Sequence, residues 1–244
     1  MSDEITFLTT QCVLGSYLLS VGGHSIKGKT RKLNNDALYC GEGLLVVADG
    51  AGKGENAGIA ARTAVAVVQD HGERKSRDRY TTRLDEVVQE ANRVVYETAQ
   101  RSEIHMATTC TALRWYGCEG KVVWELAHVG DSRAYRANFI RREYRKVTID
   151  HANNGQLIRA VGRYRDVDVE YQEGTLEHED FFILCSDGVG KAINEHDVVG
   201  FIADILRNRK GPETAATKTN KLALAINDCD NCTTAVLYVE SLTK

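Results

Sequence analysis

The sequence is poor in the residues that usually separate domains. Among 244 residues there is one proline, Pro212, and there is no proline-rich, low-complexity or repeated segment. Flexible linkers and repeat arrays are marked by such composition, and the chain is long enough to bury a sizeable core. We therefore expect a single domain over residues 1–244.

The sequence also lacks an excess of positive charge and a long hydrophobic run. Its 31 Lys and Arg residues are outnumbered by 34 Asp and Glu residues, which gives a formal net charge of -3. Proteins that bind nucleic acid carry a basic surface, and so nucleic acid is not an expected partner. The longest apolar run near the N-terminus, residues 12–21, is too short to span a bilayer, and the acidic segment before it is unlike a secretory signal. We expect a cytoplasmic protein with no membrane partner.

The seven cysteines do not form the pattern of a disulfide framework or of a zinc site. They are scattered, and several lie in apolar segments such as residues 181–185, which is typical of buried thiols. Cys229 and Cys232 form one C-x-x-C pair, but a zinc site normally needs a second pair of ligands, and the sequence has none at similar spacing. We interpret the pair as small residues that flank Asp230 and Asn231.

Apolar periodicity predicts strands near both ends of the chain, with helices between them. Short apolar runs bounded by glycine predict strands, and apolar spacing of i, i+3, i+4, i+7 predicts helices with one buried face. We expect strands at residues 17–21, 44–49, 107–116, 121–130, 132–137, 181–188 and 233–240, and helices near residues 57–70, 79–101, 195–208 and 215–226. Strands in runs with helices inserted in pairs favour an α+β layered fold over a doubly wound sheet.

Several aspartates are placed at the ends of apolar strands. Asp49 and Asp187 each follow such a strand and precede glycine. Asp230 precedes asparagine just before a strand, and Asp131 lies in the turn after residues 121–130. A strand end fixes the direction of a carboxylate, and glycine permits close approach of backbone or ions. Because converging carboxylates repel one another unless cations neutralise them, and because no His or Cys set accompanies them, the pattern favours Mg²⁺ or Mn²⁺ over zinc.

From Arg31 to Val239 the sequence resembles the metal-dependent protein phosphatases of type 2C, in their compact bacterial form. Eight motifs in the family's order carry the resemblance. They are RKLNND, VVADGAG, MATTCTAL, HVGDSRAY, TIDH, LIRAVG, LCSDGV and DNCTTAVL. The resemblance implies an α+β fold built as a four-layer α-β-β-α sandwich, with two central antiparallel sheets and helix pairs outside.

The resemblance also implies a binuclear Mn²⁺ or Mg²⁺ centre with roles for individual residues. Asp49 would bridge the two ions, the Gly50 carbonyl would bind the second, and Asp187 and Asp230 would complete the first. Asp36 would act through water, Arg31 would clamp the substrate phosphate, and Asp131 and Asn231 would support the centre. Asp150, with Asp187, would hold a third and weaker ion.

The implied function is a phosphoserine and phosphothreonine hydrolase. Two divalent ions lower the pKa of a bound water from 15.7 toward about 7, and a hydroxide bridging them would attack phosphorus without a phosphoenzyme. The implied partner is a phosphorylated protein, the product of a Ser/Thr kinase, and the default oligomeric state is a monomer. Ala51 occupies the place of a His found in many eukaryotic relatives, so a bound water would protonate the leaving group, with His151 as a less favoured candidate.

The sequence departs from the family pattern at two places that concern the site. Asn35 replaces a Glu or Gln, which should weaken the second ion without abolishing its site. Bacterial relatives carry a flap of about two dozen residues between the segments equivalent to TIDH and LIRAVG, and here only Ala152 to Gln156 intervene. We expect this deletion to leave the cleft open to bulky phosphoproteins and to displace Asp150, so that the third metal site is poorly formed.

Three other interpretations compete with this one. Residues 23–30 match the G-x-x-x-x-G-K-[ST] expression of a nucleotide-binding loop, but no helix is predicted after them, as such a loop requires. Asn35 and the missing flap leave open the interpretation that the chain is a phosphatase-like binding module with weak or no catalysis. Arg31 and the three aspartates, which are intact, argue against it. A metal-dependent nuclease is disfavoured by the negative charge.

Overall fold

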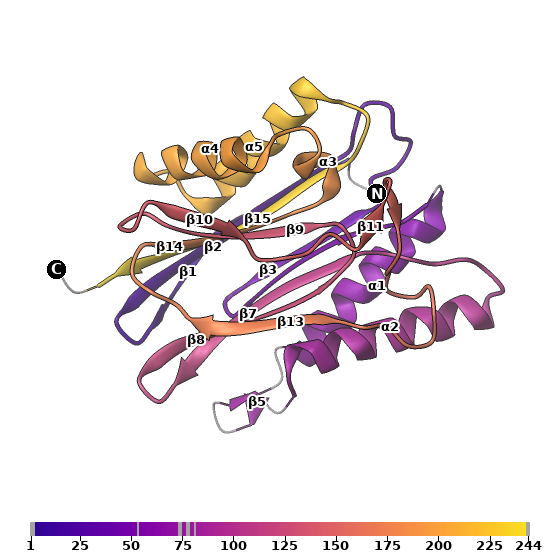
Figure 1. The fold of residues 1–244 in the computed structure, drawn as a ribbon, viewed down its shortest axis with the longest axis horizontal. Coiled ribbons are helices and arrows are strands. Elements are labelled where there is room, and N and C mark those ends of the chain that lie inside the picture. Colours follow the sequence, from indigo (N-terminus) through magenta and orange to yellow (C-terminus); the bar gives the residue numbers. More distant parts are fainter. Residues whose placement is uncertain (1–2, 53, 73–74, 77–78, 81, 243–244) are drawn as a thin grey trace.

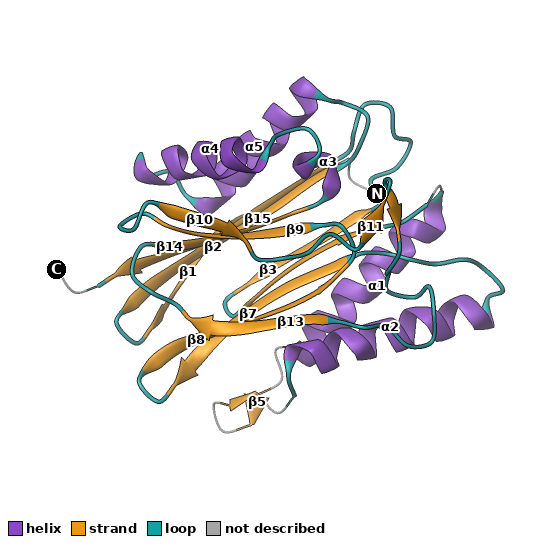
Figure 2. Ribbon diagram, viewed as in Figure 1, coloured by secondary structure: helices purple, strands orange, loops and turns teal. Residues whose placement is uncertain are grey.

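The computed structural model describes residues 3–242, except residues 53, 73–74, 77–78 and 81. Two antiparallel sheets pack face to face, and helices cover the outer face of each (Figures 1 and 2). The predicted four-layer α+β sandwich is confirmed. Both termini of the described chain belong to the same sheet, in which β1 and β15 flank β2.

The first sheet has six strands in the order β1-β2-β15-β14-β9-β10, and all neighbours are antiparallel. Their bounds are β1 Glu4–Leu14, β2 Tyr17–Ile26, β9 Arg133–Asn138, β10 Glu143–Lys146, β14 Asp180–Cys185 and β15 Cys232–Ser241.

The second sheet has five strands in the order β13-β8-β7-β4-β3, again antiparallel throughout. Their bounds are β3 Asp36–Gly41, β4 Leu44–Asp49, β7 Cys110–Cys118, β8 Lys121–Val129 and β13 Glu170–Thr175. Two small hairpins lie outside the sheets, formed by β5 Lys75–Ser76 with β6 Arg79–Tyr80 and by β11 Ala152–Asn153 with β12 Gln156–Leu157.

Helices α1 (Glu55–Gly72) and α2 (Leu84–Arg101) cover the five-stranded sheet, and α4 (Glu195–Arg207) and α5 (Pro212–Ile226) cover the six-stranded one (Figure 2). A further turn of helix, α3 (Asp187–Gly190), follows β14 directly. Because β4 is buried on both faces, its apolar run is continuous: Leu45 and Val47 pack between the sheets, while Leu44 and Val46 face the helices.

The expected strands and helices are found, with shifts at their ends and one clear error. The sequence predicted a helix from residue 79, but Arg79 and Tyr80 belong to the hairpin strand β6, and α2 begins at Leu84 after the cap residue Arg83.

The structure also shows what the apparent nucleotide-binding loop and the cysteines form. Residues 23–26 of the apparent nucleotide-binding loop lie inside β2, and no helix intervenes before β3 begins at Asp36. All seven cysteines lie within the described residues and are free thiols. Among the described residues, none of the helices combines the length and the apolar character that a bilayer-spanning helix requires.

Candidate metal centre

A cleft of about 490 Å³ opens at one end of the sandwich, where strands from both sheets end. Most of the residues singled out from the sequence line it, although they come from five separate segments of the chain, near residues 31–35, 49–51, 131, 187 and 230–231. The lining residues are Arg31, Asn35, Asp49, Gly50, Ala51, Gly52, Thr109, Asp131, Gly155, Gln156, Leu157, Arg163, Asp187, Asp230 and Asn231.

Asp49 is the last residue of β4, and its main chain is fixed by two threonines that precede β7. The Asp49 amide donates to Thr109 Oγ1 at 2.9 Å, and the Asp49 carbonyl accepts from the Thr109 amide at 2.8 Å and from Thr108 Oγ1 at 2.9 Å. Across the hairpin, Asp36 is the register partner of Asp49. The start of β3 and the end of β4 therefore deliver two carboxylates to the same place.

Asp187 and Asp230 are brought together by a close approach of the start of α3 to the loop before β15. Gly188 permits this approach, because a Cβ at that position would lie 2.0 Å from the Asn231 carbonyl oxygen. Gly50 has a similar role beside Asp49, since a Cβ there would lie 2.3 Å from the Ala57 carbonyl oxygen. These glycines follow the predicted aspartates because the backbone next to each carboxylate is tightly packed.

Arg31 reaches the same cluster from the loop after β2. Its Nη2 donates to Asp230 Oδ2 at 2.5 Å, and its Nε donates to the Cys229 carbonyl at 3.1 Å. The hydrogen bond that Arg31 donates to Asp230, together with the charges of Asp49 and Asp187, raises the pKa of Arg31. The guanidinium is therefore a permanent cation at the edge of the cleft.

The aspartates lie in an environment that disfavours their charge in the absence of cations. Burial, followed by the charges of Asp36 and Asp187, raises the pKa of Asp49 well above its ordinary value. Burial also raises the pKa of Asp36 to about 7, although hydrogen bonds from Thr233 and Ser186 oppose the shift. Among the described residues, Oδ1 of Asp36 and Oδ1 of Asp187 are buried without a hydrogen-bond partner.

These observations fit a centre of divalent cations. Buried carboxylate oxygens are normally satisfied by a hydrogen bond or an ion, and a set of oxygen ligands without His or Cys suits Mg²⁺ or Mn²⁺. The cluster is therefore electrostatically incomplete by itself, and divalent cations would complete it.

The raised pKa values predict how the stability of the metal-free protein depends on pH. An unfolded aspartate titrates near 3.9, whereas Asp36 in the folded protein titrates at about 7. Between these values the folded state binds more protons than the unfolded state, so the free energy of unfolding falls as the pH rises from about 4 to about 7.

Thermal unfolding in EDTA tests this prediction. We expect a higher Tm at about pH 5 than at about pH 7.5, with a smaller difference in Asp36→Asn, and we expect Mn²⁺ to raise the Tm most at the higher pH because it binds only the folded state. A Tm in EDTA that rises over this pH interval would contradict the proposed electrostatics.

The neighbouring residues predicted to support the centre also border the cleft. Asn231 Oδ1 accepts from the Gly28 amide at 3.2 Å and so ties the Asp230 loop to the Arg31 loop. Asn35 Nδ2 donates to the Gly54 carbonyl at 3.1 Å, and the Asn35 carbonyl accepts from the Gly50 amide at 3.2 Å. Burial and the charge of Asp187 raise the pKa of Asp131.

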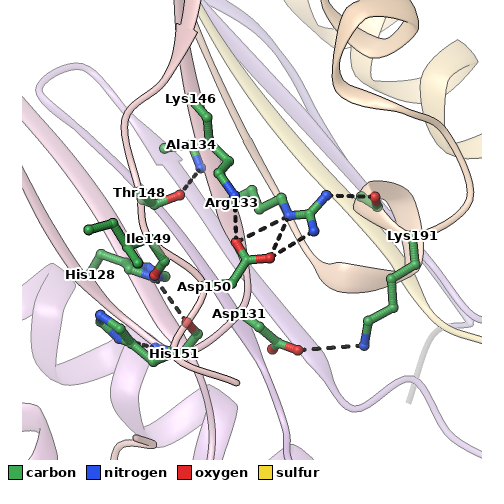
Figure 3. A network of polar contacts seen from close by, with 12 residues as sticks. His128, Asp131, Arg133, Ala134, Lys146, Thr148, Ile149, Asp150, His151 and Lys191 are labelled. Atoms are coloured by element: carbon green, nitrogen blue, oxygen red, sulfur yellow. Dashed lines mark hydrogen bonds and ion pairs between the residues drawn. The ribbon is translucent and has the colours of Figure 1, made fainter. Parts of the chain in front are cut away.

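Asp150 is the one predicted ligand that does not line the cleft. Its carboxylate accepts from Arg133 Nη2 at 2.7 Å, from Arg133 Nε at 3.1 Å and from Lys146 Nζ at 3.1 Å (Figure 3). Burial alone would raise the pKa of Asp150, but the bonds from Arg133 and Lys146 lower it. Asp150 is thus neutralised by two side-chain cations and lies outside the lining of the cleft.

Three features of the cleft were missed from the sequence. Thr109 was noted only as part of a motif, and its role in holding Asp49 depends on the pairing of distant strands. Arg163 and the hairpin residues Gly155–Leu157 form part of the rim, where Arg163 Nη1 donates to the Leu157 carbonyl at 2.5 Å. Lys191, which contacts Asp187 and Asp131, could have been found from its position four residues after Asp187.

A β-sandwich between helix pairs, with aspartates gathered at one end, is the architecture of a family of metal-dependent phosphatases. Residues 29–223 match the family model described as Protein phosphatase 2C. Because this match covers well over half of the 244 residues, the chain belongs to the protein phosphatase 2C family.

Individual relatives agree with this assignment. The chain is 24% identical over 246 residues to the serine/threonine protein phosphatase PstP of Mycobacterium tuberculosis, a match that covers 91% of this chain and 45% of the relative. It is 25% identical over 221 residues to the serine/threonine phosphatase stp of Listeria monocytogenes, covering 81% of this chain and 84% of the relative. The chain thus spans about half the length of the PstP sequence.

The fold is shared with solved structures. The catalytic domain of PstP in complex with two manganese ions superimposes with a TM-score of 0.79 and 23% identity, covering 92% of this chain and 100% of that one. At this identity the likeness shows the common fold, and the chemistry has to be argued from the residues of the cleft.

Proposed function

We propose that the chain is a metal-dependent protein phosphatase that hydrolyses phosphoserine and phosphothreonine. The observation that carries this proposal is the convergence of Asp49, Asp187 and Asp230 at one cleft, with Asp36 buried beside Asp49. Oδ1 of Asp36 and Oδ1 of Asp187 have no hydrogen-bond partner among the described residues. Membership of the protein phosphatase 2C family supports the same chemistry.

The proposed ligands of two Mn²⁺ or Mg²⁺ ions are Asp49, the Gly50 carbonyl, Asp187 and Asp230. Bound ions of this kind supply positive charge for the phosphate and acidify a bound water. Asp49 is held by its main chain between the two threonines, which fixes the direction of its carboxylate. The PstP catalytic domain, described as a complex with two manganese ions, supports this number.

Asp36 is proposed to act on the ions through a water, without binding them directly. Its Oδ2 accepts from Thr233 Oγ1 at 2.6 Å, while its Oδ1 is buried with no hydrogen-bond partner among the described residues. From this position it can hold a water and keep the Asp49 side chain in place. His151 is not proposed as the acid for the leaving group, because it does not line the cleft and its Nδ1 accepts from the Gly130 amide at 3.1 Å.

Arg31 is proposed to bind the phosphate of the substrate. Its guanidinium borders the cleft and donates to a carboxylate oxygen of Asp230, so a phosphate beside ions held by Asp230 would be within its reach. The planar fork of arginine matches two phosphate oxygens, whereas the ammonium of lysine offers a point charge.

Arg31→Lys is expected to lower kcat/KM for a phosphopeptide by about 10- to 100-fold, because a charge-assisted hydrogen bond contributes about 1.5–3 kcal/mol. Steady-state kinetics with saturating Mn²⁺ measures this loss. Lys29→Arg is the matched control, since Lys29 is exposed and pairs with Asp228 outside the cleft. Equal losses in the two variants would contradict the assignment.

The substrate is proposed to be a folded phosphoprotein made by a Ser/Thr kinase. The hairpin β11–β12 is short, and it forms one rim of the cleft together with Arg163, which leaves space for a phosphorylated loop. We further propose that the chain acts as a monomer in the cytoplasm, where its free thiols would be kept reduced.

Release of inorganic phosphate tests the function. Purified protein with Mn²⁺ is incubated with peptides that contain phosphoserine, phosphothreonine or phosphotyrosine, and with p-nitrophenyl phosphate. We expect faster hydrolysis of the first two peptides than of the third, and no hydrolysis in EDTA. Mn²⁺ binding without hydrolysis of any substrate would instead favour the phosphatase-like binding module that Asn35 leaves open.

A further inference from the structure

One lysine contacts two carboxylates of the cleft, and the proposed chemistry does not use it. Lys191 Nζ forms an ion pair with Asp187 Oδ2 and lies 3.5 Å from Asp131 Oδ2. Figure 3 shows the side chain pointing from the end of α3 toward Asp131. The two carboxylates are largely buried, with exposed fractions of 15% for the Asp187 side chain and 10% for that of Asp131, while the lysine side chain is 50% exposed.

The position of this ammonium is the place where an additional cation would bind. Asp131 and Asp187 both line the cleft, and burial together with the charge of Asp187 raises the pKa of Asp131. The third ion was expected from the sequence between Asp187 and Asp150, but Asp150 is occupied by Arg133 and Lys146. The carboxylate that accompanies Asp187 is therefore that of Asp131, and Lys191 binds both.

The backbone around Lys191 is held firmly enough to keep the ammonium there. The Lys191 amide donates to the Asp187 carbonyl at 2.8 Å, so the two side chains, four residues apart, lie on one face of the turn. Arg133 Nη1 donates to the Gly190 carbonyl at 2.8 Å. Arg133 thus ties the turn before Lys191 to the same network that withdraws Asp150.

The contact also orients Asp187. Its Oδ2 is engaged by Lys191, while its Oδ1 is buried with no partner among the described residues. Lys191 therefore neutralises one oxygen of the Asp187 carboxylate. The other oxygen stays available to an ion bound beside Asp49, whose pKa the charge of Asp187 helps to raise.

We propose that Lys191 is a tethered cation that occupies the third cation position between Asp131 and Asp187. It limits the centre to two divalent ions and acts as a positioning residue for Asp187. This inference rests on the proposed function, because it takes the Asp49 cluster to be a two-ion centre. A covalently attached ammonium loses less freedom on binding than an ion from solution, and it cannot be removed by dilution.

Removing the ammonium is expected to open this position to a metal ion. Calorimetric titration of EDTA-stripped protein with MnCl₂ should give two ions in the natural protein and three in Lys191→Met. Crystals soaked in MnCl₂ should show the additional anomalous peak between Asp131 and Asp187 in Lys191→Met only. The double variant Lys191→Met/Asp131→Asn should return to two ions, and the conservative variant Lys191→Arg should keep two.

Lys146→Met is the matched control, because Lys146 also pairs with an aspartate, Asp150, but outside the cleft. It should keep two ions. A third Mn²⁺ between Asp131 and Asp187 in the natural protein would overturn the inference, and so would two ions in both the natural protein and Lys191→Met. No Mn²⁺ binding to the natural protein would contradict the two-ion centre itself, which distinguishes a failure of the proposed function from a failure of the role of Lys191.

Discussion

Asp187→Ala is expected to lower Mn²⁺-dependent phosphatase turnover by about 10³-fold. The variant removes a carboxylate whose Oδ1 is buried without a partner among the described residues and whose charge adds to the effect of burial in raising the pKa of Asp49 and of Asp36. Loss of one ligand weakens an ion that contributes several kcal/mol of transition-state stabilisation, and each 1.36 kcal/mol changes the rate by a factor of ten. The measurement is kcat/KM for p-nitrophenyl phosphate across a series of Mn²⁺ concentrations.

Asp166→Ala is the control for this variant. Asp166 lies just before β13, is exposed, and does not line the cleft. Its activity should stay close to that of the natural protein. Circular dichroism and a thermal scan establish that Asp187→Ala is folded, so that a loss of turnover can be assigned to the centre. Activity in Asp187→Ala within a few-fold of that of Asp166→Ala would contradict the role of Asp187.

Arg114→Met is expected to have the largest effect on stability, a loss of about 3–5 kcal/mol in the free energy of unfolding. Arg114 on β7 and Glu125 on β8 are register partners with exposed side-chain fractions of only 1% and 5%. Arg114 Nε donates to Glu125 Oε2 at 2.8 Å, and Nη2 donates to the Thr82 carbonyl at 2.8 Å. Without the guanidinium, a buried carboxylate loses its cation and Thr82 loses its donor.

Urea denaturation measures this loss of unfolding free energy. Two further variants show whether the loss comes from the unpaired buried carboxylate. Arg114→Met/Glu125→Leu should recover much of the stability, because replacing a whole buried ion pair by apolar groups is often neutral. Arg93→Met is the exposed control, since Arg93 pairs with Glu90 and Glu97 on the surface of α2 and should change stability by less than about 1 kcal/mol. Equal losses of unfolding free energy in Arg114→Met and Arg93→Met would contradict the larger contribution to stability that we assign to the buried ion pair.

The aspartates of the candidate metal centre could be identified from the sequence because each lies in a recognisable local pattern. An apolar strand followed by Asp-Gly specifies where the carboxylate points, and the structure explains the glycine by backbone contacts of 2.3 Å and 2.0 Å that a Cβ would make at Gly50 and Gly188. The four-layer fold was likewise predictable, because the resemblance extends over nearly the whole chain.

The partners of Asp150 and Asp131 were not accessible in the same way. Asp150 is engaged by Arg133 from β9 and by Lys146, and Asp131 by Lys191 after β14. These contacts depend on how loops from different strands meet, and a motif does not record them. The start of α2 was missed for a local reason, since apolar periodicity does not show where the hairpin β5–β6 ends and Leu84 begins the helix.

The central claim is that the aspartate cluster holds the ions on which phosphate hydrolysis depends. The most direct test measures bound Mn²⁺ and phosphothreonine hydrolysis in the same samples, as EDTA-stripped protein is reloaded step by step. We predict that hydrolysis is absent in the stripped protein and reaches its maximum when two ions are bound. Full hydrolysis in the stripped protein, or none in the fully loaded protein, would contradict the claim.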